Sequence, residues 1–150
     1  MKHEEFQISR SFVIAMENGE DFFEMLKRFC EDRSIRQAIM PGFIAGFEYA
    51  KLVGTVKQVD DRSAPIWDHC YVENVEVLGA GTICYDDQGN FSPHVHVSVG
   101  EKERGGVATT SHLIEARVIF LAEMVVHEVS GISMLRRRDP KLYDVPLLGF

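Results

Sequence analysis

Apolar and polar residues alternate in several stretches of this 150-residue chain, and a period of two is typical of strands that bury one face. The alternation is clear over Tyr71–Leu78, and Phe6–Met16 also predicts a strand, in which Phe12–Ala15 runs through a buried layer. Further strands are predicted in five stretches: Ile35–Met40, Phe43–Val53, Thr82–Tyr85, Phe91–Val99 and Val118–Val129. In the last of these, the β-branched residues favour a central strand over a helix.

Glycine and proline mark breaks in this pattern. Pro41-Gly42 interrupts one apolar stretch, and Gly79-Ala80-Gly81 breaks or bulges another. The polar segment Lys57–Pro65 is predicted to be a loop, and Glu101–Gly106 a charged turn. The tail, Ile132–Phe150, is predicted to be extended along the surface or to lie at a subunit contact, and its residues 136–150 form a C-terminal extension of the domain.

One stretch follows helical spacing instead. Asn18-Gly19-Glu20-Asp21 ends the first strand and starts a helix, because acidic residues favour a helix N-terminus. The helix is expected to end near Asp32 or Arg33. Its apolar residues form one face that should pack on a sheet: Phe22, Phe23, Leu26, Phe29 and Cys30.

The strand Phe91–Val99 carries the chain's most distinctive chemistry. Its valines point to one face, and the other face carries His94, His96 and Ser98. The turn formers of Asp86–Asn90 precede it and predict a hairpin with Thr82–Tyr85. Two imidazoles that are two residues apart on one face can converge on a metal ion. His112, in Ser111-His112-Leu113, offers a third nitrogen.

Each of these residues also has a structural interpretation. The three histidines could equally form hydrogen-bonded rungs on a half-exposed sheet face, with no metal. Glu123 lies in an apolar strand, where an unpaired carboxylate is costly, so we consider it either a general base near the metal or a salt-bridged structural residue. His127 is interpreted as structural, and His69, beside the only tryptophan, as a packed or rim residue.

Composition narrows the class of protein. Apolar residues make up 45% and charged residues 26%, which is typical of a soluble globular protein, and the length favours one domain over residues 1–150. The net charge of −7 argues against a large nonspecific DNA-binding face. The only basic run, Arg136-Arg137-Arg138, is interpreted as a solvated segment near the end of the last strand.

Cysteine usage indicates a reducing compartment. Cys30, Cys70 and Cys84 form no CxxC motif. An odd count without a signal peptide predicts free thiols in a cytoplasmic protein. No apolar run is long enough to span a bilayer.

The order of these motifs resembles the PPC domain, the plants and prokaryotes conserved domain, in its stand-alone prokaryotic form. The similarity rests on Pro93-His94-Val95-His96, on Ser111-His112-Leu113 and on an acidic residue in a final apolar strand, and it covers roughly Phe6 to Leu135. Members commonly carry two glycines before the third histidine, where this chain has Thr110-Ser111. The chain also lacks the Arg-Gly-Arg-Pro of an AT-hook.

The resemblance implies an α+β fold with a mostly antiparallel sheet, one main helix packed on it, and a homotrimer. It also implies a divalent metal ion, with zinc as the expected metal, held by His94, His96 and His112. Three protein ligands leave a fourth position for water or a small molecule, so a metal-dependent hydrolase or lyase is one hypothesis. A DNA-binding or transcription-regulatory module is the alternative that the wider family suggests, and a scaffold that recruits another protein is a third.

Overall fold

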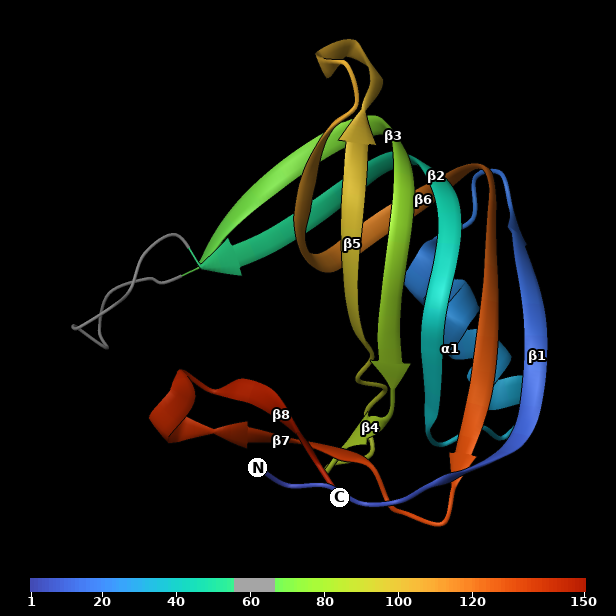
Figure 1. Cartoon of the computed structure of the whole chain (residues 1–150), viewed down its shortest axis with the longest axis vertical. Coiled ribbons are helices and arrows are strands. Elements are labelled where there is room, and N and C mark those ends of the chain that lie inside the picture. Colours follow the sequence, from blue (N-terminus) through green and yellow to red (C-terminus); the bar gives the residue numbers. More distant parts are fainter. Residues whose placement is uncertain (56–66) are drawn as a thin grey trace.

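Five long strands form the main sheet of the computed structural model, which describes residues 1–55 and 67–150. The order is β1-β6-β2-β3-β5, and every pairing is antiparallel (Figure 1). The strands are β1 (Gln7–Glu17), β2 (Ala38–Thr55), β3 (Trp67–Ile83), β5 (His94–Glu101) and β6 (Val107–Ser130). Strand β5 also pairs with the start of β6, so β2, β3, β5 and β6 form a closed ring.

A smaller sheet holds the C-terminal part of the chain. Its order is β4-β7-β8, and it lies at the lower end of the main sheet in Figure 1. These strands are β4 (Tyr85–Asp86), β7 (Leu135–Asp139) and β8 (Val145–Gly149), and two 3-10 helices, η1 (Lys102–Arg104) and η2 (Pro140–Leu142), complete the described elements. The β4–β7 pairing is parallel and the β7–β8 pairing antiparallel. The tail predicted to run along the surface is therefore a folded hairpin.

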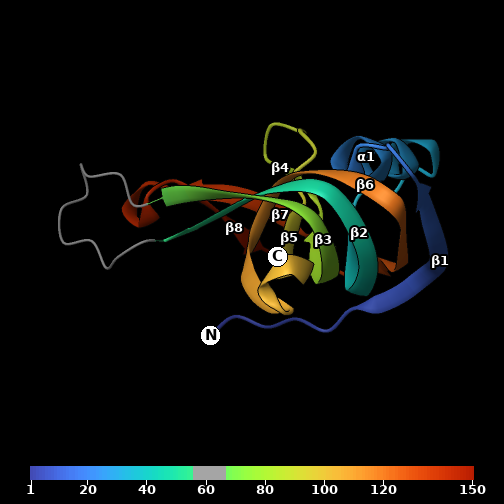
Figure 2. The same cartoon turned by 90° about the horizontal axis from the view of Figure 1, so that it is seen from above.

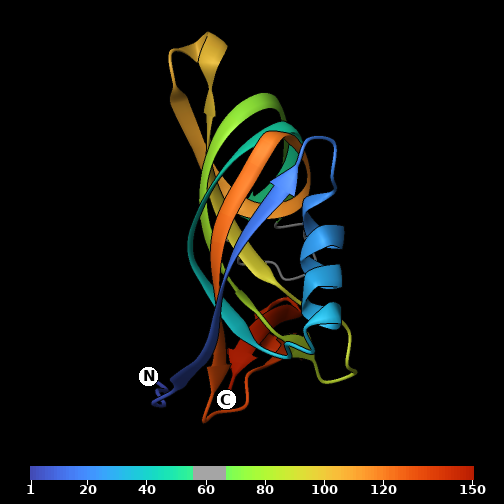
Figure 3. The same ribbon diagram turned by 90° about the vertical axis from the view of Figure 1, so that its right-hand side faces the viewer.

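The helix α1 (Phe22–Asp32) lies along one side of the curved sheet, beside β1 and β6 (Figure 2; Figure 3). It begins where the sequence predicts, because the Asp21 carboxylate accepts a hydrogen bond of 2.8 Å from the Glu24 amide. Such a cap contributes about 1 kcal/mol. The prediction of a mostly antiparallel sheet with one main helix packed on it is confirmed.

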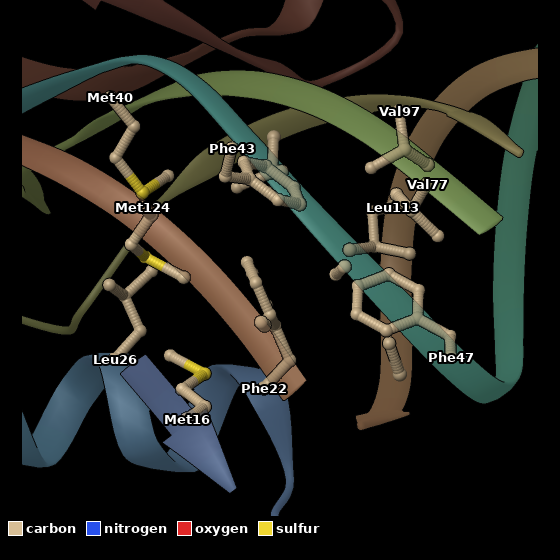
Figure 4. Close-up of a cluster of buried hydrophobic side chains, with 14 of the residues drawn as sticks. Met16, Phe22, Leu26, Met40, Phe43, Phe47, Val77, Val97, Leu113 and Met124 are labelled. Atoms are coloured by element: carbon tan, nitrogen blue, oxygen red, sulfur yellow. The ribbon is translucent and has the colours of Figure 1, made fainter. Parts of the chain in front are cut away.

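The core lies between α1 and the sheet (Figure 4). Phe22 has no exposed surface, and the centroid of its ring lies 5.2 Å from that of Phe43 and 5.6 Å from that of Phe47. Cys30 is also fully buried on the same helix face, as predicted, and burial raises the pKa of its thiol to about 12. All three cysteines are free.

Two strand predictions need correction. Phe12–Ala15 does not run through a buried layer: residues on β1 alternate between faces, and Val13 is 84% exposed. Pro41-Gly42 does not end a strand either, because β2 continues through a register shift between Met40 and Phe43. The predicted loop at residues 57–65 lies outside the described residues.

The glycines of β3 serve close packing and do not interrupt the strand. Gly79 pairs with Val97 and Gly81 with Val95 in regular register. A Cβ atom on Gly79 would lie 2.3 Å from the Phe43 ring. Glycine is therefore needed at this position so that the Phe43 side chain can pack against β3. The predicted break in the strand is absent. In the described part of the chain, no helix is long and apolar enough to cross a membrane.

Candidate metal centre

The three histidines meet where the ring of strands closes. His94 and His96 lie on β5, as predicted, and Val95 between them is buried. His112 lies on β6, directly opposite His96 in the β5–β6 pairing. It is also opposite Val53 in the β2–β6 pairing. Strand β6 thus leaves β5 and joins β2 at His112, and this crossing places the third imidazole beside the other two.

The three rings form a compact triangle. The ring centroid of His94 lies 4.9 Å from that of His96 and 4.9 Å from that of His112, and the remaining distance, His96 to His112, is 5.4 Å. One nitrogen from each ring lies within 4.8 Å of the other two. The Nε2 atoms of His94 and His96 are 3.1 Å apart.

These atoms fit a divalent metal ion. Zinc–nitrogen bonds of about 2.0–2.1 Å in tetrahedral geometry separate two ligand nitrogens by roughly 3.3 Å, close to the separation seen between His94 and His96. The Nδ1 atom of His112 is buried and has no hydrogen-bond partner among the residues that the structure describes. Buried polar atoms are normally satisfied, so an orphaned imidazole nitrogen within a histidine cluster supports a ligand there.

The environment favours the neutral form of two of these imidazoles. Burial lowers the pKa of His94 to about 4, with further lowering by the charge of Arg136 and by the neighbouring histidines. Burial, His96 and Arg136 likewise lower the pKa of His112. Neutral imidazole is the form that binds metal, so His94 and His112 need not lose a proton at neutral pH to become ligands.

A cavity of about 830 Å³ opens beside the histidines, within the size range of small-molecule sites. Its walls come from three parts of the chain: the histidine strands, the paired ends of β2 and β3, and the β7–β8 hairpin. Trp67 and His69 line it from β3, so His69 lies in the cavity wall but outside the three-histidine group. Tyr143 and Val145 line it from the C-terminal hairpin.

The residues that replace the two glycines before His112 also line this cavity. Ser111 donates a hydrogen bond of 2.5 Å to the Val53 carbonyl oxygen. Thr110 donates one of 3.1 Å to the Ser98 hydroxyl. Both side chains are thus tied to neighbouring strands, and they hold β6 against β2 on one side and β5 on the other.

Glu123 does not meet the histidines within the described protomer. It is exposed on β6, opposite Ala15 of β1 and Ile44 of β2, and does not line the cavity. The premise that it is buried in an apolar strand was therefore wrong, while its role in catalysis stays a prediction. His127 shares a hydrogen bond of 2.9 Å with Ser11, in keeping with a structural role.

Arg136 is the site residue that the sequence did not identify. It was interpreted as solvated with its two neighbours, but it is 5% exposed and lines the cavity. Arg137 and Arg138 are exposed. The alternation of β7 separates Arg136 from Arg137, because successive residues of a strand point to opposite faces. Arg138 lies on the same face as Arg136 and lines the same cavity, although it is exposed. A strand assignment at Leu135–Asp139 could have identified an inward arginine.

Comparison with protein-family models identifies a family for this chain. Residues 3–130 match the Plants and Prokaryotes Conserved (PCC) domain, also abbreviated PPC. No curated protein matches the sequence. Among solved structures, the chain is similar to a PPC protein from Pyrococcus horikoshii, with 24% identity, a TM-score of 0.82, and coverage of 100% of this chain and 98% of that one.

Two further structures share the fold. A metal-containing protein from Archaeoglobus fulgidus is 21% identical, with a TM-score of 0.79 and complete coverage of both chains. A protein from Ralstonia eutropha described as a candidate DNA-binding protein is 20% identical, with a TM-score of 0.76 and coverage of 92% of this chain and 90% of that one.

Proposed function

Because this chain belongs to the Plants and Prokaryotes Conserved domain family, we propose that it binds a divalent metal ion in a site that also binds a small molecule. Zinc is the metal that we expect. His94, His96 and His112 would hold the ion. When bound, such an ion supplies a Lewis acid with a coordination position left for a ligand. The similar fold of a metal-containing archaeal protein supports this proposal.

The observation that carries the proposal is the convergence of three imidazoles beside a cavity. Their nitrogens lie within 4.8 Å of one another, and the cavity that they line has a volume of about 830 Å³. Hydrogen-bonded rungs without a metal would leave no reason for a buried, unpartnered nitrogen on His112. A cavity of this size also gives a metal-bound ligand room that a purely structural cluster would not need.

Elemental analysis of tag-free protein tests the metal site. We expect about one divalent metal per chain in the wild type, and its loss in the His94→Ala/His96→Ala double variant. His69→Ala is the matched control, because His69 lines the same cavity outside the cluster. Equal metal content in all three proteins, or none in the wild type after incubation with zinc, would refute the proposal.

We further propose that the protein is a homotrimer, assembled through the outer face of the sheet. Leu78 and Ile44 are directly paired there and are 63% and 54% exposed. Val13 and Val125, also paired and exposed, extend this surface across β1 and β6. Several exposed apolar side chains on one face of a sheet favour an interaction site, and the exposed Glu123, opposite Ile44, lies on the same face. Light scattering that gives a monomer mass would contradict the trimer.

Direct DNA binding has less support in this structure. The net charge is −7, and the basic run is divided: Arg136 is buried, and Arg138 donates a hydrogen bond to the Asp144 carbonyl oxygen. Few cations remain there to neutralise phosphates. A gel shift titrated with salt should show no complex at low salt, and a salt-dependent complex would restore the DNA hypothesis.

A further inference from the structure

We propose that the cavity takes a small organic acid and that Arg136 binds its carboxylate group. The inference rests on the proposed metal site, since the same ligand would extend toward the three histidines. It adds the chemical class of that ligand and a residue dedicated to its charge. Four observations carry it: the burial of Arg136, its lack of an acidic partner, its position beside the histidines, and the character of the remaining cavity wall.

Arg136 is a buried cation without a counter-ion. It is 5% exposed, and no carboxylate of the described residues forms an ion pair with it. It donates a hydrogen bond from Nη2 to the Thr82 hydroxyl, at 2.5 Å, and it also hydrogen-bonds the Cys84 thiol, a neutral group. Among the described residues, its Nε atom is buried without an acceptor. An unpaired buried charge is strongly destabilising, so an arginine kept in this state points to a ligand that completes it.

The position of Arg136 connects it to the histidine cluster. Thr82, its hydrogen-bond partner, lies directly opposite His94 in the β3–β5 pairing. Arg136 and the three histidines line one cavity. A small ligand in it can therefore contact both.

The cavity wall favours a monocarboxylate over a more highly charged anion. Arginine presents a planar fork that matches a carboxylate, and the bond to Thr82 fixes its orientation. The exposed Arg138 also lines the cavity, but it is bonded to Asp144, whose own carboxylate brings one negative charge to the wall. Most other lining residues are apolar or uncharged: Trp67, Pro93, Ile114, Val145 and Pro146.

Titration with glycolate, a small carboxylate, tests the assignment. The protein is loaded with cobalt(II), whose visible absorption reports ligand binding, and Kd is measured for wild type, Arg136→Gln and Arg137→Gln. Arg137 is the matched control because it is adjacent, exposed and outside the cavity. We expect Arg136→Gln to raise the Kd at least tenfold, about 1.4 kcal/mol, and Arg137→Gln to leave it unchanged. Ethylene glycol, a neutral analogue, should bind both variants equally.

Two results would overturn the inference. One is a glycolate Kd in Arg136→Gln equal to that of the wild type. The other is inorganic phosphate binding as tightly as glycolate with the same dependence on Arg136, which would reject the carboxylate assignment. If Arg136→Gln does not fold, Arg136→Lys keeps the charge, loses the fork, and should still weaken glycolate binding.

The metal and the arginine can fail separately. Metal content is measured in every variant, and Arg136→Gln should retain the metal of the wild type. If the wild type binds no metal, the proposed function fails, but the role of Arg136 can still be tested. Acetate should then raise the Tm of the metal-free wild type and leave the Tm of Arg136→Gln unchanged. A structural role predicts that Arg136→Met lowers the Tm of metal-free protein, whereas a ligand-binding role predicts an equal or higher Tm, because an uncompensated buried charge is removed.

Discussion

Gly81→Ala tests whether the backbone of β3 sets the position of the histidines. A Cβ atom on Gly81 would lie 2.5 Å from the backbone carbonyl oxygen of His94, and 3.1 Å from both the Met40 methyl carbon and a Val95 methyl carbon. The carbonyl oxygen belongs to the main chain of β5, so it cannot rotate away as a side-chain atom could. The added methyl group must therefore push β5 away from β3 at His94.

The size of the effect follows from that distance. An ordinary van der Waals contact requires β5 to move by about 0.9 Å, whereas metal–ligand distances tolerate only about 0.2 Å. We expect metal affinity to fall roughly tenfold to hundredfold, as when other supports of a ligand are lost. Overpacking of this kind costs about 1–3 kcal/mol, which should lower the Tm of the metal-free protein by roughly 3–10 °C.

Competition with a chelator of known affinity measures the first effect, and thermal unfolding measures the second. Gly100→Ala is the control, because Gly100 also lies in the β3–β5 pairing, on β5. Its added Cβ would lie 3.8 Å from the nearest atom, the carbonyl oxygen of Glu76 on β3, which is an ordinary contact. It should leave both quantities near the wild-type values. Wild-type metal affinity in a folded Gly81→Ala protein would refute the reasoning that β3 positions His94.

Three further predictions follow from the structure. His94 and His112 have a lower pKa in the folded than in the unfolded chain, so the unfolded chain binds more protons as the pH falls. The Tm of metal-free protein should therefore be highest above about pH 6.5 and fall as the pH drops toward 4. Thermal melts that give the same Tm across this range would contradict this prediction. Leu78→Glu places a charge on the proposed trimer surface and should give a monomer mass in light scattering with little change in far-UV circular dichroism; a trimer that persists would exclude this face. Glu123→Gln should leave metal affinity unchanged in chelator competition, because the carboxylate lies on the outward face of β6.

Local patterns were sufficient to predict the parts of the fold that depend on neighbouring residues. The helix was predicted because Asp21 caps it and its apolar residues follow one face. The hairpin before the histidine strand was predicted because Asp86 organises the turn: its carboxylate accepts hydrogen bonds from the Gln88 and Asn90 amides. Period-two alternation was likewise sufficient to place His94 and His96 on one face.

Features that depend on distant parts of the chain were not predicted. Nothing near Arg136 in the sequence distinguishes it from Arg137, because its burial arises from pairing of β7 with β4 and from contact with Thr82. The continuous strand through Pro41-Gly42 depends on partners on both sides of β2, which absorb the register shift. The convergence of His112 with the other histidines was inferred from a family resemblance, since spacing alone does not determine which strands pair.

The position of His112 on β6 gives metal uptake a place in the folding reaction. His112 lies opposite His96 in the pairing of β5 with the start of β6, two strands joined by a short turn. This local hairpin brings the third imidazole to the other two, and hairpins form fast compared with the long-range pairing of β6 with β2. A chelating dye in a stopped-flow refolding experiment should therefore lose its metal to the protein before the ring of strands has closed. The bound ion would then stabilise the β5–β6 hairpin on which β2 and β3 assemble.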